Sequence, residues 1–172
     1  MAINYGSHEL ITTGSYRVSS SDLIGEEIFV AAISWPTTQN VAAGQFPDIT
    51  KCTASKDTKS GYNGTTGYYT FQQTGLYLIE AQGQFASMCV NDRTISALYI
   101  NSSWFDFGET VIPYYKSDWG SVHSGAFIRS MSVNQTIALA SFVDATQATC
   151  ENPPQTRKKL GKWRIFRVNN AS

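Results

Sequence analysis

The segment Thr66–Ala86, TGYYTFQQTGLYLIEAQGQFA, constrains the fold of this chain more than any other part of the sequence. Two runs of aromatic and aliphatic residues flank a polar stretch, Gln72–Gly75. A helix here would have Gly75 in its interior, which costs about 1 kcal/mol relative to alanine. It would also contain many β-branched and aromatic residues, which lose rotamer freedom in helices. The segment therefore predicts two strands joined by a turn.

Similar runs of strand composition, separated by clusters of turn-forming residues, recur along the chain. No amphipathic helical pattern accompanies them, and 172 residues are enough for one domain with its own core. The expected strands are Glu27–Ile33, Tyr68–Phe71, Gly75–Ala86, Thr94–Asn101, Val111–Tyr115, Ser124–Ser132, Thr136–Val143 and Lys162–Val168. Eight strands is the number that a jelly roll requires, so the sequence predicts an all-β sandwich.

The first 26 residues differ in composition from the rest. They are rich in Gly, Ser and Thr and contain only scattered apolar residues, which is typical of an extended arm. We therefore expect an N-terminal arm at residues 1–26 and a jelly-roll domain at residues 27–172. The arm residues expected to order against a neighbouring molecule are Ile3, Tyr5, Leu10, Ile11 and Tyr16.

Charge excludes some partners. Lys plus Arg equals Asp plus Glu, at 13 each, so no net field attracts nucleic acid or an anionic membrane. Six basic residues nevertheless cluster near the C-terminus: Arg157, Lys158, Lys159, Lys162, Arg164 and Arg167. The cluster is interpreted as a solvated loop leading into the last strand, or alternatively as a contact with an acidic partner surface or phosphate.

Three cysteines, Cys52, Cys89 and Cys150, form no CxxC pair and are odd in number. They predict free thiols in a reducing compartment. The start of the chain lacks the basic and apolar regions of a signal peptide, and no run of about 18 apolar residues predicts a transmembrane helix.

Catalytic and metal-binding patterns are weak. His8 and His123 lack ligand spacing with Cys or carboxylates, and no Gly-x-Ser-x-Gly elbow surrounds the serines near His123. Asp106, Glu109 and Asp118 are better explained as solvated loop acids or a calcium site than as a glycosidase pair. We expect a non-enzymatic protein without a cofactor or a resident metal.

The segment NSSWFDFGETVIPYYKSDWG is unusually rich in aromatic residues. Tyr and Trp in loops provide large contact areas at a low entropy cost, so the segment predicts a recognition loop for a protein or a glycan. The alternative is a satellite cluster that closes one end of the sandwich. The residues concerned are Trp104, Phe105, Phe107, Tyr114, Tyr115 and Trp119.

The Phe71–Tyr77 segment, a strand end followed by Thr-Gly-Leu-Tyr, resembles the hairpin motif of the tumour-necrosis-factor and complement globular-head superfamily. EEIFVAAIS resembles its first strand, SGAFIRSMSVNQTIALASF a later hairpin and KWRIFRV its last strand, although Val133-Asn134-Gln135 replaces the usual Gly-Asp turn. The resemblance implies a jelly roll of about 8–10 strands that assembles as a compact homotrimer with aromatic residues on its threefold axis. Candidates for the axis, or else for the core of one subunit, are Tyr69, Tyr77, Tyr99, Phe127 and Phe142.

INYGSHELITTG, residues 3–14, resembles the segments that open structural proteins of tailed bacteriophages. This resemblance implies a virion protein on the capsid surface, made in the host cytoplasm, that stabilises the phage head as a trimeric decoration or cement protein bound to the major capsid protein. The alternative is the receptor-binding tip of a head or tail fibre, which recognises a host-surface glycan or protein.

Overall fold

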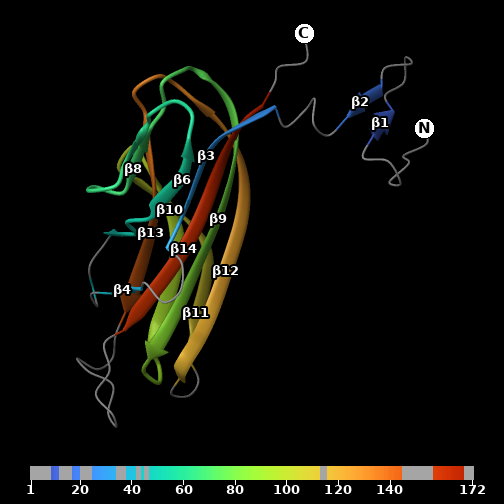
Figure 1. Cartoon of the computed structure of the whole chain (residues 1–172). Coiled ribbons are helices and arrows are strands. Elements are labelled where there is room, and N and C mark those ends of the chain that lie inside the picture. The colour runs from blue at the N-terminus through green and yellow to red at the C-terminus, as the bar shows by residue number, and fades with distance from the viewer. Residues whose placement is uncertain are drawn as a thin grey trace.

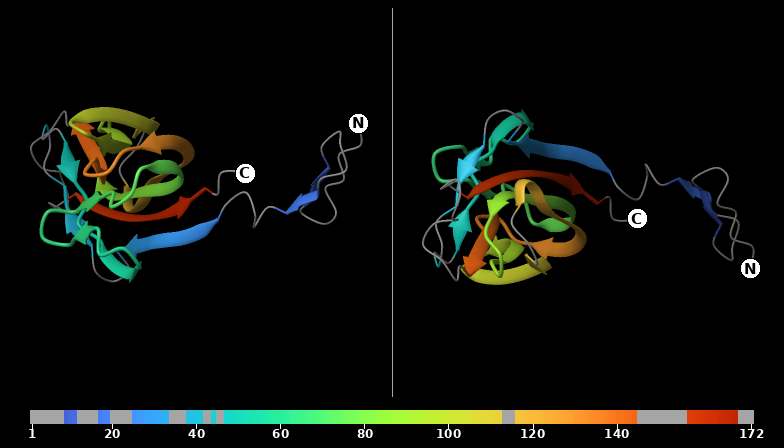
Figure 2. Two further views of the ribbon diagram at one scale, coloured as in Figure 1. Left: turned by 90° about the horizontal axis from the view of Figure 1, so that it is seen from above. Right: turned by 90° about the horizontal axis from the view of Figure 1, so that it is seen from below.

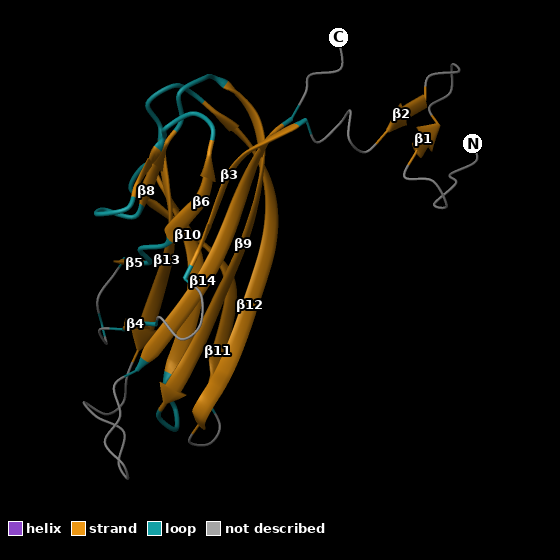
Figure 3. Cartoon of the chain, in the orientation of Figure 1, coloured by secondary structure: helices purple, strands orange, loops and turns teal. Residues whose placement is uncertain are grey.

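The computed structural model describes residues 9–11, 17–19, 25–33, 38–41, 44, 47–112, 116–144 and 157–168, with only the backbone described at 9–11, 17–19 and 116–120. All regular structure in these residues is β, and two antiparallel sheets pack face to face (Figures 1 and 3). The all-β jelly-roll prediction is confirmed. No helix in the described residues has the length and hydropathy to cross a bilayer.

One sheet, here called the β9 sheet, has the strand order β12–β9–β14–β3–β6, with β4 paired to β14. Its long central strands run side by side in Figure 1. The strands are β3 (Glu26–Ala32), β4 (Gln39–Asn40), β6 (Thr53–Asp57), β9 (Gly75–Met88), β12 (Lys116–Met131) and β14 (Lys158–Arg167).

The other sheet, here called the β10 sheet, has the order β11–β10–β13–β8–β7, with β5 paired to β13. Figure 2 shows the two layers, with β3 and β14 in one and β11 and β13 in the other. The strands are β5 (Asp48–Ile49), β7 (Tyr62–Asn63), β8 (Tyr68–Thr70), β10 (Arg93–Ile100), β11 (Ser103–Val111) and β13 (Thr136–Asp144). In the arm, β1 (Glu9–Ile11) and β2 (Arg17–Ser19) pair with each other.

Seven of the eight expected strands are present with shifted ends. Of the strand expected at Val111–Tyr115, Val111 is the last residue of another strand, Ile112 is not in a strand, and residues 113–115 lie outside the described residues. The chain instead forms β11 at Ser103–Val111, directly after β10. Asn101 and Ser102 both have positive φ, 46° and 65°. Two consecutive positive φ angles make the tight turn that matches the twist of a hairpin, so β11 folds back on β10 at once.

The turn at Gln72–Thr74 does not join a hairpin. β8 pairs with β7 and β13, whereas β9 pairs with β12 and β14, so this turn carries the chain from one sheet to the other. The segment Ser124–Phe142 behaves in the same way, because β12 lies in the β9 sheet and β13 in the β10 sheet. Both hairpin predictions are therefore wrong, because strand composition predicts extended backbone but not its hydrogen-bonding partner.

Aromatic rings form the centre of the core between the sheets. Phe29 packs on Tyr62, Tyr69 and Trp163, with ring centroids 4.7 to 5.0 Å apart. Tilted and edge-to-face pairs of this kind stabilise a core beyond the area that they bury. A second apolar cluster near the other end of the sandwich consists of Val41, Phe85, Met88, Ile112 and Val143.

The sheets approach closely at two glycines that are paired across β9 and β14, Gly83 and Gly161. A Cβ atom at Gly161 would lie 2.4 Å from Leu139 Cδ2, and one at Gly83 would lie 2.1 Å from Ser96 Oγ. Both contacts are shorter than any real Cβ contact. The Cβ at Gly83 would also lie 2.8 Å from Ser96 Cβ, which no side-chain rotation relieves, so a side chain at Gly83 would push the sheets apart.

The cysteine prediction is correct for Cys52 and wrong for Cys89. Cys52 is a free, buried thiol, and burial raises its pKa to about 12. Cys89 is disulfide-bonded. Cys150 lies outside the described residues. An odd number of cysteines shows only that they cannot all be paired within one chain; it does not exclude a single disulfide. The number of cysteines therefore gives no evidence for a reducing compartment.

We expect Gly83→Ala to destabilise the protein by about 1 to 3 kcal/mol, the usual cost of overpacking a core, because the added Cβ would lie 2.8 Å from Ser96 Cβ. Urea denaturation measures this free energy of unfolding. Gly64→Ala is the matched control, since the nearest atom to a Cβ there is Tyr62 Cε1 at 3.8 Å. Equal stability of the two variants would contradict the close approach of the sheets.

Candidate interaction surfaces

A row of apolar side chains crosses the outer face of the β9 sheet. Ile128 on β12 is in register with Leu78 on β9, which is in register with Phe166 on β14. Ile128 is 65% exposed, more than any other exposed large hydrophobic residue in the described part of the chain. Residues directly opposite on neighbouring strands lie about 5 Å apart. The three side chains therefore form one apolar row.

Charged groups lie beside this row. Arg164 is ion-paired with Glu80 and, at 3.9 Å, with Glu27, which also pairs with Lys56 at 3.3 Å. An apolar centre with a polar rim is the usual anatomy of a protein–protein interface. The face also has a shallow depression of about 440 Å³ above small residues of β12, lined by Glu80, Gln82, Ser124, Ala126, Lys162 and Arg164.

The C-terminal basic cluster does not form a solvated loop. Five of its six members belong to β14, and Arg157 immediately precedes that strand. Arg157 is buried and bonds Asp92 through two nitrogens, at 2.8 and 3.0 Å. Alternation along a strand sends successive side chains to opposite faces, so the basic residues do not form one patch. Lys162 is exposed and lines the depression.

Aromatic residues form a row on the outer face of the β10 sheet. Trp104 is in register with Tyr99, Tyr99 with Ala138, and Ala138 with Tyr68. The rings of Tyr68 and Tyr99 meet edge-to-face, with centroids 6.4 Å apart, and Ala138 is fully buried. The three aromatic side chains are partly exposed. This face is the second surface with a composition suited to binding.

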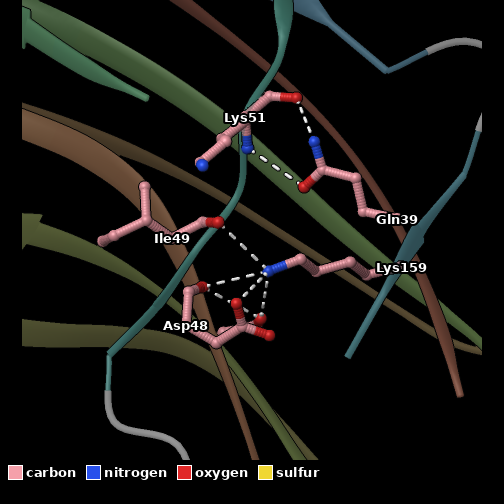
Figure 4. Close-up of polar contacts among 6 residues, drawn as sticks. Gln39, Asp48, Ile49, Lys51 and Lys159 are labelled. Atoms are coloured by element: carbon pink, nitrogen blue, oxygen red, sulfur yellow. Dashed lines mark hydrogen bonds and ion pairs between the residues drawn. The ribbon is translucent and has the colours of Figure 1, made fainter. Parts of the chain in front are cut away.

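A buried lysine joins the two sheets. Lys159 on β14 is ion-paired with Asp48 Oδ1 at 2.7 Å, and its ammonium group donates to the carbonyl oxygens of Asp48 and Ile49 and to Ser141 Oγ (Figure 4). Burial lowers the pKa of Lys159, and Asp48 opposes this shift. Because the ammonium group is enclosed by the chain's own oxygens, this cluster is structural.

His123 is also buried between the sheets. Its Nδ1 lies 3.0 Å from Ser96 Oγ and its Nε2 lies 2.9 Å from Thr110 Oγ1. Ser96 has no exposed surface, so this serine–histidine pair cannot meet a substrate. In the described residues, no three His, Cys, Asp or Glu side chains gather as metal ligands.

The segment predicted to be a recognition loop lies largely in strands β11 and β12. Trp104, Phe105 and Phe107 lie on β11, and alternation sends Trp104 to the outer face. Phe105 and Phe107 instead pack against the core, where Phe107 contacts Phe127 with ring centroids 5.9 Å apart. These two residues therefore pack on the main core, which matches neither a recognition loop nor the satellite cluster that was the alternative. Tyr114, Tyr115 and the side chain of Trp119 lie outside the described residues.

Of the five residues predicted for the threefold axis, Tyr69 and Tyr77 belong to the core of a single subunit, with 0% and 2% exposure. This corrects their assignment, because such residues have no surface to offer a second subunit. Phe127 points between the sheets at their open edge, towards Phe107. Tyr99 and Phe142 are partly exposed on the outer face of the β10 sheet. Whether any of these last three faces an axis stays a prediction.

The other residues singled out in the sequence are the apolar residues of the arm and three acidic residues, Asp106, Glu109 and Asp118. Leu10 and Ile11 lie on β1, where only the backbone is described, and Ile3, Tyr5 and Tyr16 lie outside the described residues. Glu109 bonds Arg93 through two oxygens, at 2.6 and 3.0 Å. Asp106 is exposed on β11, and the side chain of Asp118 is not described.

The prediction from sequence missed the row of Ile128, Leu78 and Phe166. Its signal was present on β12, where Ile128 shares a face with Ser124, Ala126 and Ser130 instead of with the large residues Phe127 and Met131. Period-2 alternation along β12 therefore places this large aliphatic residue on the outer face of the sheet.

Acid should destabilise the fold through His123. Burial lowers its pKa below the ordinary value of 6.5, with Glu109 opposing. The unfolded chain therefore binds the proton more readily, and the free energy of unfolding falls as pH drops below about 6.5. His123→Gln should lose less stability than the wild type between about pH 7 and 5. Parallel denaturation curves for the two proteins across this range would contradict the assignment.

The sequence matches no protein-family model and no curated protein. Among solved structures, the globular domain of a zebrafish complement 1qA protein matches with a TM-score of 0.59 and 17% identity, over 84% of this chain and 99% of that one. Murine APRIL matches with a TM-score of 0.46 and 9% identity, over 81% and 98%. The first likeness shows the fold: this chain is a jelly roll similar to that of the complement 1qA globular domain.

Proposed function

We propose that this protein is a non-enzymatic structural module that assembles as a homotrimer through the outer face of the β9 sheet. The observation that carries the proposal is the row of Ile128, Leu78 and Phe166. Contiguous apolar side chains on a surface mark an interaction site, since water contact with them is unfavourable. The ion pairs beside the row supply the polar rim.

The trimer is supported by the resemblance of the sequence to families that assemble in threes. Identical subunits that meet head-to-tail form a closed ring when the rotation between them closes. In such a ring each subunit contributes two different surfaces, and the apolar row is one of them.

We propose further that the trimer decorates a phage capsid, stabilises the head, and binds the major capsid protein through residues 1–26. The support is the resemblance of the arm to the opening segments of phage structural proteins. The chain would be made in the host cytoplasm and act on the virion surface. The disulfide at Cys89 suits that place, because virion surfaces are oxidising environments.

A second role, the receptor-binding tip of a head or tail fibre, is favoured by a different observation. The aromatic row of Trp104, Tyr99 and Tyr68 lies on the opposite face of the sandwich from the proposed subunit interface. Assembly through the β9 sheet would leave this row accessible on the outside of the trimer. Partly exposed Tyr and Trp side chains are enriched in binding surfaces.

Light scattering coupled to size exclusion should give three times 18.9 kDa for the full chain. Ile128→Asp should convert this species to monomers at micromolar concentration, because each interface would bury an unpaired charge. Val133→Asp is the matched control, since Val133 is also exposed but lies in a turn outside the row. A monomeric wild type, or an Ile128→Asp trimer as stable as the control, would reject this interface.

Deletion of residues 2–24 should abolish binding to undecorated capsids and leave the trimer intact. The arm is too poor in apolar residues to fold alone, and three arms acting together raise avidity. Co-sedimentation with capsids measures the effect, and adhesion to host cells is measured in parallel. Capsid binding that survives the deletion would place attachment in the jelly roll. Adhesion of the full chain to cells but not capsids would favour the receptor-binding role.

A further inference from the structure

We propose that Tyr68, Tyr99 and Trp104 form a platform that binds a neutral oligosaccharide along the outer face of the β10 sheet. The inference rests on the second proposed role, recognition, and requires neither the trimer nor the capsid. It names a site and a chemical class of ligand for that role.

The geometry of the platform comes from strand register. Trp104, Tyr99 and Tyr68 lie on β11, β10 and β8, with Ala138 of β13 between the two tyrosines. Neighbouring strands are about 4.8 Å apart, so the row extends for about 14 Å across the sheet. The small side chain of Ala138 lets the rings of Tyr68 and Tyr99 approach each other above it. The result is a linear aromatic surface suited to an extended chain of a few sugar units.

The chemistry of the rings suits sugars. An aromatic ring has a negative face, which attracts the weakly positive C–H groups on the flat side of a pyranose. Burial, and secondarily Tyr99, raises the pKa of Tyr68, so its hydroxyl stays neutral at ordinary pH. Neither tyrosine hydroxyl is hydrogen-bonded to another described residue. Each therefore remains able to donate to and accept from sugar hydroxyl groups.

Nearby charges favour a neutral glycan over an acidic one. Asp106 follows Trp104 by two residues on the same face, and it is exposed. Its carboxylate accepts hydrogen bonds from sugar hydroxyls but repels carboxylate, sulfate or phosphate groups on a ligand. The guanidinium of Arg93, on the same face, is held by Glu109 through two hydrogen bonds. Among the described residues of this face, the platform therefore offers no uncompensated cation to an acidic sugar.

The residues beside the rings favour a glycan over a protein partner. Thr70 and Thr136 are paired with each other on this face, next to Tyr68 and Ala138. They add neutral hydroxyl groups instead of apolar area. A stable protein–protein interface needs about 800 Å² from each partner with an apolar centre. A narrow row of rings among hydroxyl groups fits a sugar chain better.

The test is isothermal titration calorimetry of the full chain with soluble oligomers of glucose, mannose, galactose and N-acetylglucosamine. Oligogalacturonate and a sialylated oligosaccharide serve as acidic comparisons. At least one neutral oligomer should bind, and Tyr99→Ala and Tyr68→Ala should each weaken that binding at least about tenfold, or about 1.4 kcal/mol. Val111→Ala, an exposed apolar residue of the same face outside the row, should bind like the wild type.

Melting temperatures establish that each variant is folded, and Trp104→Ala replaces any tyrosine variant that is not. The platform is overturned if no neutral oligomer binds at millimolar concentration, if the acidic oligomers bind more tightly, or if the alanine variants bind as well as the wild type. Adhesion to host cells without binding to any soluble oligomer would also overturn it. That last result would retain the recognition role and indicate a protein receptor.

Discussion

The structure depends on how closely its two sheets can approach. Gly83 faces Ser96 and Gly161 faces Leu139, and because neither glycine has a side chain, the backbones of β9 and β14 lie against the β10 sheet. At this short distance a single side chain can reach from one sheet to the other. Lys159 does so when its ammonium group meets Asp48. The buried polar contacts therefore follow from the absence of two Cβ atoms.

Buried polar groups restrict how the two sheets of this core can be positioned relative to each other. A charge such as that of Lys159 or Arg157 is costly to bury unless its partner lies in one defined place. Asp48 provides the partner of Lys159 from β5 of the other sheet, and Asp92 provides the partner of Arg157 from the turn between β9 and β10. The Lys159–Asp48 pair spans the two sheets, so sliding of one sheet over the other would break it. An apolar core alone would oppose such sliding less.

The sequence predicted the kind of fold well, because alternating apolar residues and turn clusters are local signals. It could not predict which strands pair. The turn after Phe71 was interpreted as a hairpin because nothing near Gln72 and Gln73 records that β8 and β9 belong to different sheets. For the same reason, aromatic richness did not distinguish Tyr69, which is buried, from Tyr99, which is partly exposed. Ile128 was overlooked because exposure depends on which face of β12 meets the core.

The position of β14 in its sheet has a consequence for how the chain acquires its structure. β14 lies between β3 and β9, which are not paired with each other, although both precede it in the sequence by many residues. During synthesis, the edges of β3 and β9 that pair with β14 stay unpaired until residues 158–167 leave the ribosome. Long-range pairing of this kind folds slowly, and unpaired strand edges are prone to aggregate in the meantime. The sandwich therefore closes only after β14 has been synthesised, and until then the edges of β3 and β9 that it covers are exposed.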